Sequence, residues 1–244
     1  MIAALVACLA FGAQEPEAPS AAALISKMLA HYSGLKSLTG TIRLTTRVAS
    51  SEQVLVTTVQ FKKPSLVFIR QAYDSGEGRS WLVVSDGRRF SYPVPPNLPL
   101  TAEERLVEAV TQNGVVNTCQ DIYAASSASL KDRSAPLDIA FGRLTDLRFL
   151  RNQWVTLRWL GQQSYRDRTV DAIGGDWREY GRAPASGTYR MLISKDSDLV
   201  LYELAGREAV GDPARGILVP LLVTSTWEVD LHPNAETDDS LFKL

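Results

Sequence analysis

Short segments in which apolar and polar residues alternate run through most of this 244-residue chain. In the first of them, LTGTIRLTTRV at 38–48, every second residue belongs to one face, as is typical of a strand that packs on a core. Further segments of strand length lie at 54–63, 65–73, 80–86, 88–94, 153–161, 168–173, 188–194, 199–205 and 217–231. The turn signals between them include Lys63-Pro64, Asp86-Gly87, Gly174-Gly175 and Gly211-Asp212-Pro213. This pattern predicts an antiparallel meander of about ten strands, which should curl because wide flat sheets are rare.

Helical spacing replaces the alternation in three places. A first helix is expected from Ser20, its N-cap, to Gly34, before the sheet begins. A second is predicted over 101–114, where Thr101 and Glu104 have the spacing of a capping box. A third is predicted over 134–149, with one apolar stripe formed by Leu137, Ala140, Phe141, Leu144 and Leu147. The last two belong to an insertion of about fifty residues within the strand meander, and insertions that long often act as lids.

The composition limits the possible partners. Lys and Arg total 26 and Asp and Glu total 27, which gives a net charge of −1 without a basic block. Nucleic acid is therefore not expected as a partner. The chain is long enough to bury a sizeable core, so a single domain over 20–244 is predicted.

The N-terminus has an uncharged apolar run, residues 2–13, followed by a polar stretch with proline. The run is too short to span a bilayer and is typical of a secretory signal, here residues 1–13. The alternative is a lipoprotein signal, in which LVAC at 5–8 would make Cys8 the lipid-anchored residue. Export to the periplasm is the expectation in both cases.

The sequence offers few groups for catalysis or metal binding. The only histidines, His31 and His232, stand in unrelated contexts without a metal-ligand spacing. Removal of the signal leaves Cys119 as the single cysteine, with no histidine near it in sequence, which favours a structural thiol. Nucleophile elbows, phosphate-binding loops and dinucleotide fingerprints do not occur. A protein without catalytic activity, metal or cofactor is therefore predicted, and a secreted hydrolase is the weakest alternative.

Apolar side chains on both faces of several strands need an explanation. In SLVFIRQAY, Leu66 and Phe68 belong to one face, and Val67, Ile69 and Tyr73 belong to the other. A sheet covered by helices on both faces would account for this pattern. Two or three helices are too few to cover ten strands twice, so a half-barrel that holds an apolar ligand is favoured.

Four segments, in their order along the chain, resemble the bacterial periplasmic lipoprotein carriers, the LolA/LolB-like proteins, and the related outer-membrane lipoprotein-sorting proteins. The segments are MLAHYSGLKSLTGTIRLTTRV, FKKPSLVFIRQAY, WLVVSDGRRFSYPVP and EVDLHPNAETDDSLF. The resemblance implies an α+β fold, a curved antiparallel half-barrel with helices that cap an apolar concave face. It also implies a cavity for acyl chains and places Lys63 where the family has the arginine that latches the lid, although lysine is a single point donor.

These observations lead to one main hypothesis: an exported, monomeric carrier that holds the acyl chains of a lipoprotein or another lipid. Donor and acceptor proteins at the inner and outer membranes are possible partners. The residues predicted to bound the cavity are Phe68, Trp81, Val83, Phe90 and Tyr92. The residues predicted to form the lid are Leu106, Val110, Leu137, Phe141 and Leu144, with Lys63 as the latch. The alternative from another class is an envelope sensor that binds a partner protein, as the related sigma-factor regulators do.

Overall fold

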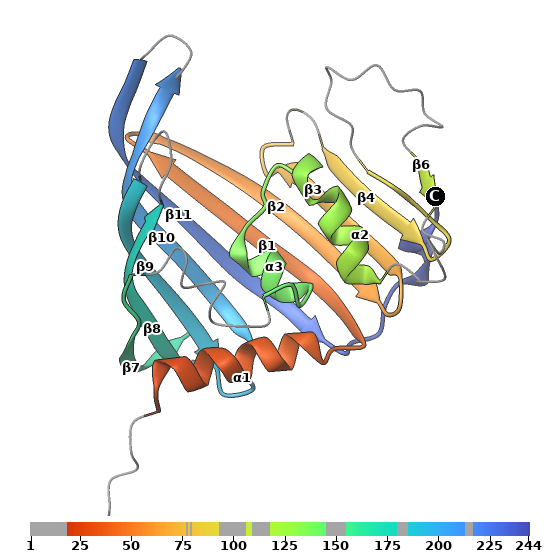
Figure 1. The fold of residues 1–244 in the computed structure, drawn as a ribbon, viewed down its shortest axis with the longest axis horizontal. Coiled ribbons are helices and arrows are strands. Elements are labelled where there is room, and N and C mark those ends of the chain that lie inside the picture. The colour runs from red at the N-terminus through yellow and green to blue at the C-terminus, as the bar shows by residue number, and fades with distance from the viewer. Residues whose placement is uncertain are drawn as a thin grey trace, which may run out of the picture.

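The computed structural model arranges the chain as one open antiparallel sheet with its α-helices on one side (Figure 1). It describes residues 19–76, 78, 80–92, 106–108, 118–144, 155–179, 185–212 and 217–244. Their strands follow the order β6-β5-β4-β3-β2-β1-β11-β10-β9-β8-β7. The α+β half-barrel is thus confirmed, with 11 strands instead of about ten. The predicted signal peptide, including Cys8, lies outside the described residues.

The sheet consists of two meanders that meet at β1 and β11. The first runs through β1 (Ser37–Val48), β2 (Ser51–Lys62), β3 (Leu66–Tyr73), β4 (Trp81–Asp86), β5 (Arg89–Ser91) and β6 (Leu106–Glu108). The second runs through β7 (Arg158–Tyr165), β8 (Arg168–Glu179), β9 (Ala185–Ser194), β10 (Leu199–Asp212) and β11 (Ile217–Pro233). Residues near the two ends of the chain become neighbours at the seam, where Ile42 is opposite Val229.

Three α-helices occur among the described residues: α1 (Ala21–Ser33), α2 (Cys119–Ser126) and α3 (Ala135–Ala140). The Ser20 hydroxyl caps α1 by accepting a hydrogen bond from the Ala23 amide, and Gly34 ends the helix, which confirms the prediction for this segment. In Figure 1, α1 runs along one end of the sheet, whereas α2 and α3 lie over the face formed by β1 to β4. None of the described helices is both long and apolar enough to cross a membrane.

The helix predicted over 101–114 is wrong at its centre, because Leu106–Glu108 forms β6. Phe90 of β5 is opposite Val107, so the segment extends the sheet. Helical spacing is a local signal, and the hydrogen bonds offered by a neighbouring strand edge can override it. The other residues of the predicted helix lie outside the described residues.

The third predicted helix is shorter than expected, since α3 ends at Ala140. Gly142 follows with a φ of +66°, and a Cβ there would be 3.3 Å from Ser33 Cα of α1. The positive φ favours glycine and stops the helix, and the close approach of α1 leaves little room for a Cβ. Residues 145–149 of the prediction lie outside the described residues.

The turn predicted at Gly174-Gly175 is also wrong, because both glycines lie inside β8. A Cβ on Gly175 would collide with the carbonyl oxygen of Thr156, and one on Gly174 would lie 2.8 Å from the carbonyl oxygen of Tyr189. The pair therefore permits close backbone approach within the sheet, which is the other common reason for glycine in a strand.

Candidate functional site

The concave face of the sheet, the face toward the helices, carries the main apolar cluster. The side chains on this face come from every second residue of a strand. Phe61 of β2 is opposite Val67 of β3, and Val59 is opposite Ile69. All four side chains belong to a cluster that also includes the inner faces of α1, α2 and α3. The fold therefore buries its core between this face and the helices.

Four of the five residues predicted to bound the cavity belong to this cluster. Val83 and Phe90 are buried in it, and Trp81 and Tyr92 pack against it while remaining partly exposed. Phe68 does not belong to it, because it alternates with Val67 and Ile69 and lies opposite Gln60 on the convex face. The prediction for Phe68 is therefore corrected: both faces of β3 are apolar, so the sequence pattern could not show which one is concave.

Aromatic side chains from the helical segment occupy the space above the concave face. The Phe141 ring stacks on Tyr123 of α2, with centroids 4.5 Å apart and an interplanar angle of 8°. The same ring lies 5.3 Å from the ring of Phe61 on β2. Leu137 is fully buried in the cluster and Leu144 packs against it. These contacts fill part of the apolar face with the chain's own side chains.

Two of the predicted lid residues cannot be placed against the concave face. Leu106 lies in β6 and belongs to the sheet, and its side chain is not described. Val110 lies outside the described residues. Of the residues predicted for the lid, the structure therefore places Leu137, Phe141 and Leu144 over the sheet. Helix α2, which the sequence did not predict, lies over the same face.

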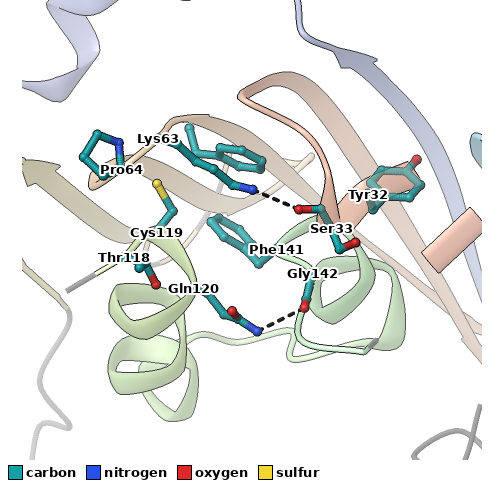
Figure 2. A pocket seen from close by; sticks show the side chains of 10 residues that line it. Tyr32, Ser33, Lys63, Pro64, Thr118, Cys119, Gln120, Phe141 and Gly142 are labelled. Atoms are coloured by element: carbon teal, nitrogen blue, oxygen red, sulfur yellow. Dashed lines mark hydrogen bonds between the residues drawn. The ribbon is translucent and has the colours of Figure 1, made fainter. Parts of the chain in front are cut away.

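A pocket of about 530 Å³ opens beside Phe141, between the ends of the helices and the turn from β2 to β3 (Figure 2). Its floor is aromatic, formed by the buried Tyr32, Phe61 and Phe141. Its rim is polar and exposed, and it includes Ser33, Lys63, Thr118 and Gln120. Pockets of this size, with a mostly apolar lining and a few placed polar groups, are typical of sites for small ligands.

The Lys63 ammonium crosses the rim and donates a hydrogen bond to the Ser33 carbonyl oxygen at 3.0 Å (Figure 2). The acceptor belongs to the C-terminal end of α1, whereas the prediction placed the latch on the lid. On the other side of the pocket, the Gln120 amide of α2 donates to the Gly142 carbonyl oxygen at 3.0 Å. The segment from α2 to Gly142 is thus tied to itself at the pocket, and Lys63 ties the turn between β2 and β3 to α1.

Cys119 also lines the pocket, but its environment favours the neutral thiol. Burial raises its pKa to about 12, even though the Lys63 ammonium acts in the opposite direction. The thiol lies 3.5 Å from the Leu66 carbonyl oxygen and 3.6 Å from that of Lys62. A thiol with this pKa is a poor nucleophile at neutral pH, which agrees with the structural role predicted for it.

Gln71 of β3 holds the segment between α2 and α3 against the sheet, a role that the sequence analysis missed. Its carbonyl oxygen accepts hydrogen bonds from the amides of Lys131 and Asp132, at 2.8 and 3.0 Å. Its amide group donates to the Asp132 carbonyl oxygen at 2.9 Å and to the Thr57 hydroxyl at 3.1 Å. The available signal was a polar residue two positions after the inward-facing Ile69, on the same face of β3.

The Asp132 carboxylate adds a second attachment, which reaches the other half of the sheet. One of its oxygens accepts hydrogen bonds from the Trp227 indole of β11 at 3.1 Å and from the Ser134 hydroxyl at 3.0 Å. Burial raises its pKa above the ordinary value of 3.8, and the two donors act in the opposite direction. A buried carboxylate without hydrogen-bond donors is costly. The segment is therefore favoured where Trp227 and Ser134 can both donate to Asp132, which is over the seam between β1 and β11.

The histidines take structural and surface positions in the structure. His31 Nε2 of α1 lies 3.1 Å from an oxygen of Asp198, in the turn between β9 and β10. His232 is exposed, 3.8 Å from Asp230. Within the described parts of the chain, no three His, Cys, Asp or Glu side chains are grouped so that they could hold a metal ion.

No protein-family model matches the chain, and no curated protein matches it. Among solved structures, it is similar to the Pseudomonas aeruginosa MucA/MucB complex, at 12% identity and a TM-score of 0.42 over 92% of this chain. The chain spans 60% of the length of the chain that it matches there. It is also similar to the lipoprotein LppX of Mycobacterium tuberculosis, at 11% identity and a TM-score of 0.38, over 89% of this chain and 97% of that one.

A LolA superfamily protein from Nitrosomonas europaea is another similar structure, at 10% identity and a TM-score of 0.30, over 93% of this chain and 99% of that one. The superfamily that the sequence resembles is thus also found among the similar structures. At these identities and TM-scores the similarity supplies no argument about the ligand. The function proposed below therefore rests on the residues of this chain.

Proposed function

We propose that the chain is a carrier that binds acyl chains of a lipoprotein or another lipid on the concave face of its sheet. The acyl chains would take the place of the aromatic plug, the rings of Phe141 and Tyr123 that cover Phe61. The observation that carries the proposal is the stack of Phe141 on Tyr123 against Phe61. A plug of side chains beside a pocket of about 530 Å³ can be displaced by an apolar ligand without exposing the sheet to water.

The energetics of such an exchange are balanced. Burial of apolar surface contributes about 25 cal/mol per Å², so an acyl chain that loses a few hundred Å² to the sheet gains several kcal/mol. Displacement of the plug costs a comparable amount, since a buried phenylalanine contributes about 3 kcal/mol or more. When the free energies of the closed state and the ligand-bound state are nearly equal, the carrier can both take up its ligand and release it.

Export to the periplasm, a monomeric state and protein partners that donate and accept the lipid complete the proposal. They follow from the predicted signal at residues 1–13 and from the sequence resemblance. The proposal needs no cofactor and no catalytic group, because transfer of a lipid between sites breaks no covalent bond.

The direct test is to purify the protein under native conditions and identify bound lipids by mass spectrometry. Co-purified acyl lipids, together with saturable fluorescence enhancement of an apolar probe by the delipidated protein, are the expected result. Correctly folded, delipidated protein that gives a flat titration would contradict the carrier function.

A further inference from the structure

Lys63 supplies the only ammonium group among the described residues that line the pocket. Lys62 and Lys63 are neighbours in sequence but differ in their partners. The Lys62 ammonium lies 2.9 Å from the Asp239 carboxylate. Lys63 instead donates to the neutral Ser33 carbonyl oxygen, and no carboxylate among the described residues lies within ion-pair distance of it. Lys63 therefore carries a positive charge that the described part of the protein does not neutralise.

The position of this charge fits an amphiphilic ligand. Lys63 is exposed at the rim, while Phe61 and Phe141 lie buried at the floor, so polarity changes from the rim to the floor of one pocket. Asp121, the acid next to the rim, accepts hydrogen bonds from the amide and hydroxyl of Thr118 at 2.8 and 2.7 Å. Its carboxylate is thus engaged in the helix cap of α2.

We infer that Lys63 selects acyl ligands with an anionic head group, a carboxylate or a phosphate, whose chain enters over Phe141. This inference rests on the proposed function and names its ligand class. An ammonium at a partly exposed site gains a charge-assisted hydrogen bond from an anion, in exchange for a neutral one to the Ser33 carbonyl oxygen. A neutral head group offers no such gain.

The experiment measures a ratio of affinities. The full delipidated chain is titrated with a fluorescent C18 fatty acid and with its methyl ester, which share the same acyl chain. The wild type is expected to bind the acid about two- to fivefold more tightly, the size of one charge contact at an exposed site. Lys63→Ala is expected to bring the ratio to about 1, whereas Lys63→Arg keeps it.

The ratio separates head-group recognition from closure of the pocket. Loss of the hydrogen bond from Lys63 to Ser33 changes the affinities for the acid and the ester by the same factor. This effect therefore cancels in the ratio of the two affinities. Lys62→Ala is the matched control, because it removes a neighbouring charge that is already paired with Asp239. This control is expected to leave the ratio unchanged. Added salt is expected to reduce the wild-type ratio, since it screens exposed charges.

Competition with a C18 lysophosphatidic acid and with a neutral monoacylglycerol distinguishes the two sources of the anion. Displacement of the fatty acid by the phosphate lipid in preference to the neutral one identifies a phosphate head group as a ligand. Displacement by neither restricts the class to carboxylates.

Equal affinity for acid and ester in the wild type, or a ratio that Lys63→Ala does not change, overturns the inference and leaves the carrier function standing. If neither probe binds to folded, delipidated protein, both the inference and the proposed function are wrong.

Discussion

Two buried glutamines hold backbone segments onto the sheet, one on each face. Gln71 binds the segment between α2 and α3 on the concave face. Gln60 binds the C-terminal segment on the convex face, where its carbonyl oxygen accepts from the Asp238 amide at 3.2 Å and its amide donates to the Asp238 carbonyl oxygen at 2.8 Å. Both side chains are almost completely buried, at 0% and 3% exposure.

The two segments cover very different surfaces. The concave segment lies over the main apolar cluster and precedes Phe141. The convex segment leads into the short helix η4 (Asp239–Phe242), which packs on β3 and β4 through the buried Phe242. Elsewhere the convex face carries exposed ion pairs, such as Arg47 with Glu52, and a small cluster around Leu192. The same kind of polar contact therefore holds a segment over the apolar cluster on one face and a C-terminal segment on the other.

The largest expected effect is that of Phe141→Ala. Loss of this buried ring is expected to lower the free energy of unfolding by about 3 kcal/mol. Apparent affinity for an acyl probe is expected to rise, because the ligand no longer competes with the stack on Tyr123. Thermal melting and probe titration measure the two quantities.

Phe68→Ala on the convex face is the matched control. Phe68 is half-buried, so a smaller loss of stability is expected, with no change in probe affinity. Loss of stability without a gain in affinity for Phe141→Ala would show that the helical segment is a permanent layer of the fold.

The next effect compares Gln71→Ala with Gln60→Ala. Gln71→Ala leaves the buried backbone groups of Asp132 without their partner and is expected to cost about 2 kcal/mol in unfolding free energy. Gln60→Ala is expected to cost less, about 1 kcal/mol, because its partner Asp238 is exposed to water. Only Gln71→Ala is expected to tighten probe binding, since only its segment covers the concave face. Equal probe affinities for the two variants would contradict the assignment of the ligand to that face.

The two segments are also expected to respond to pH in opposite directions. Burial raises the pKa of Asp132, so between 3.8 and that raised pKa the native state holds a proton that the unfolded chain releases. Stability contributed at this site therefore falls as pH rises through that window. The pKa of Asp238 is lowered, mainly by the Ser240 hydroxyl, so its contribution is lost as pH falls below 3.8.

Asp132→Asn keeps the shape of the side chain and removes its charge. This variant is expected to melt at a higher temperature than the wild type at neutral pH, and to lose less stability as pH rises. Asp138, whose pKa burial also raises, leaves part of the pH dependence in place. Asp238→Asn is expected to lower the melting temperature at neutral pH. A lower melting temperature for Asp132→Asn would mean that its hydrogen bonds outweigh its desolvation.

The smallest effects are expected for the histidines. His31→Ala loses a part-buried hydrogen bond with Asp198 and is expected to cost about 1 kcal/mol or less. His232→Ala changes an exposed residue and is expected to be neutral. Neither is expected to change probe affinity, and a large loss from either one would indicate a catalytic or metal-binding role.

Much of the fold could be predicted because its signals are local. The alternation in 38–48 specified β1, and Ser20 with Gly34 specified both ends of α1. The hairpin around Asp86-Gly87 was also readable from its turn residues, and Val83 and Phe90 on its two strands lie in the concave cluster. These features depend on residues a few positions apart, whose preferences act before any distant contact forms.

Tertiary structure decided what depends on distant partners. Alternation shows that two faces of a strand differ, but Phe68 and Ile69 are both apolar, and only the curvature of the sheet and the helices above it make one face concave. Leu106–Glu108 became a strand because β5 offered an edge for pairing. Gln71 became a clamp because residues 131 and 132, sixty positions away in sequence, present their amides to it. Hydrogen bonds between such distant groups leave no periodic signal in the sequence, so they had to be found in the fold.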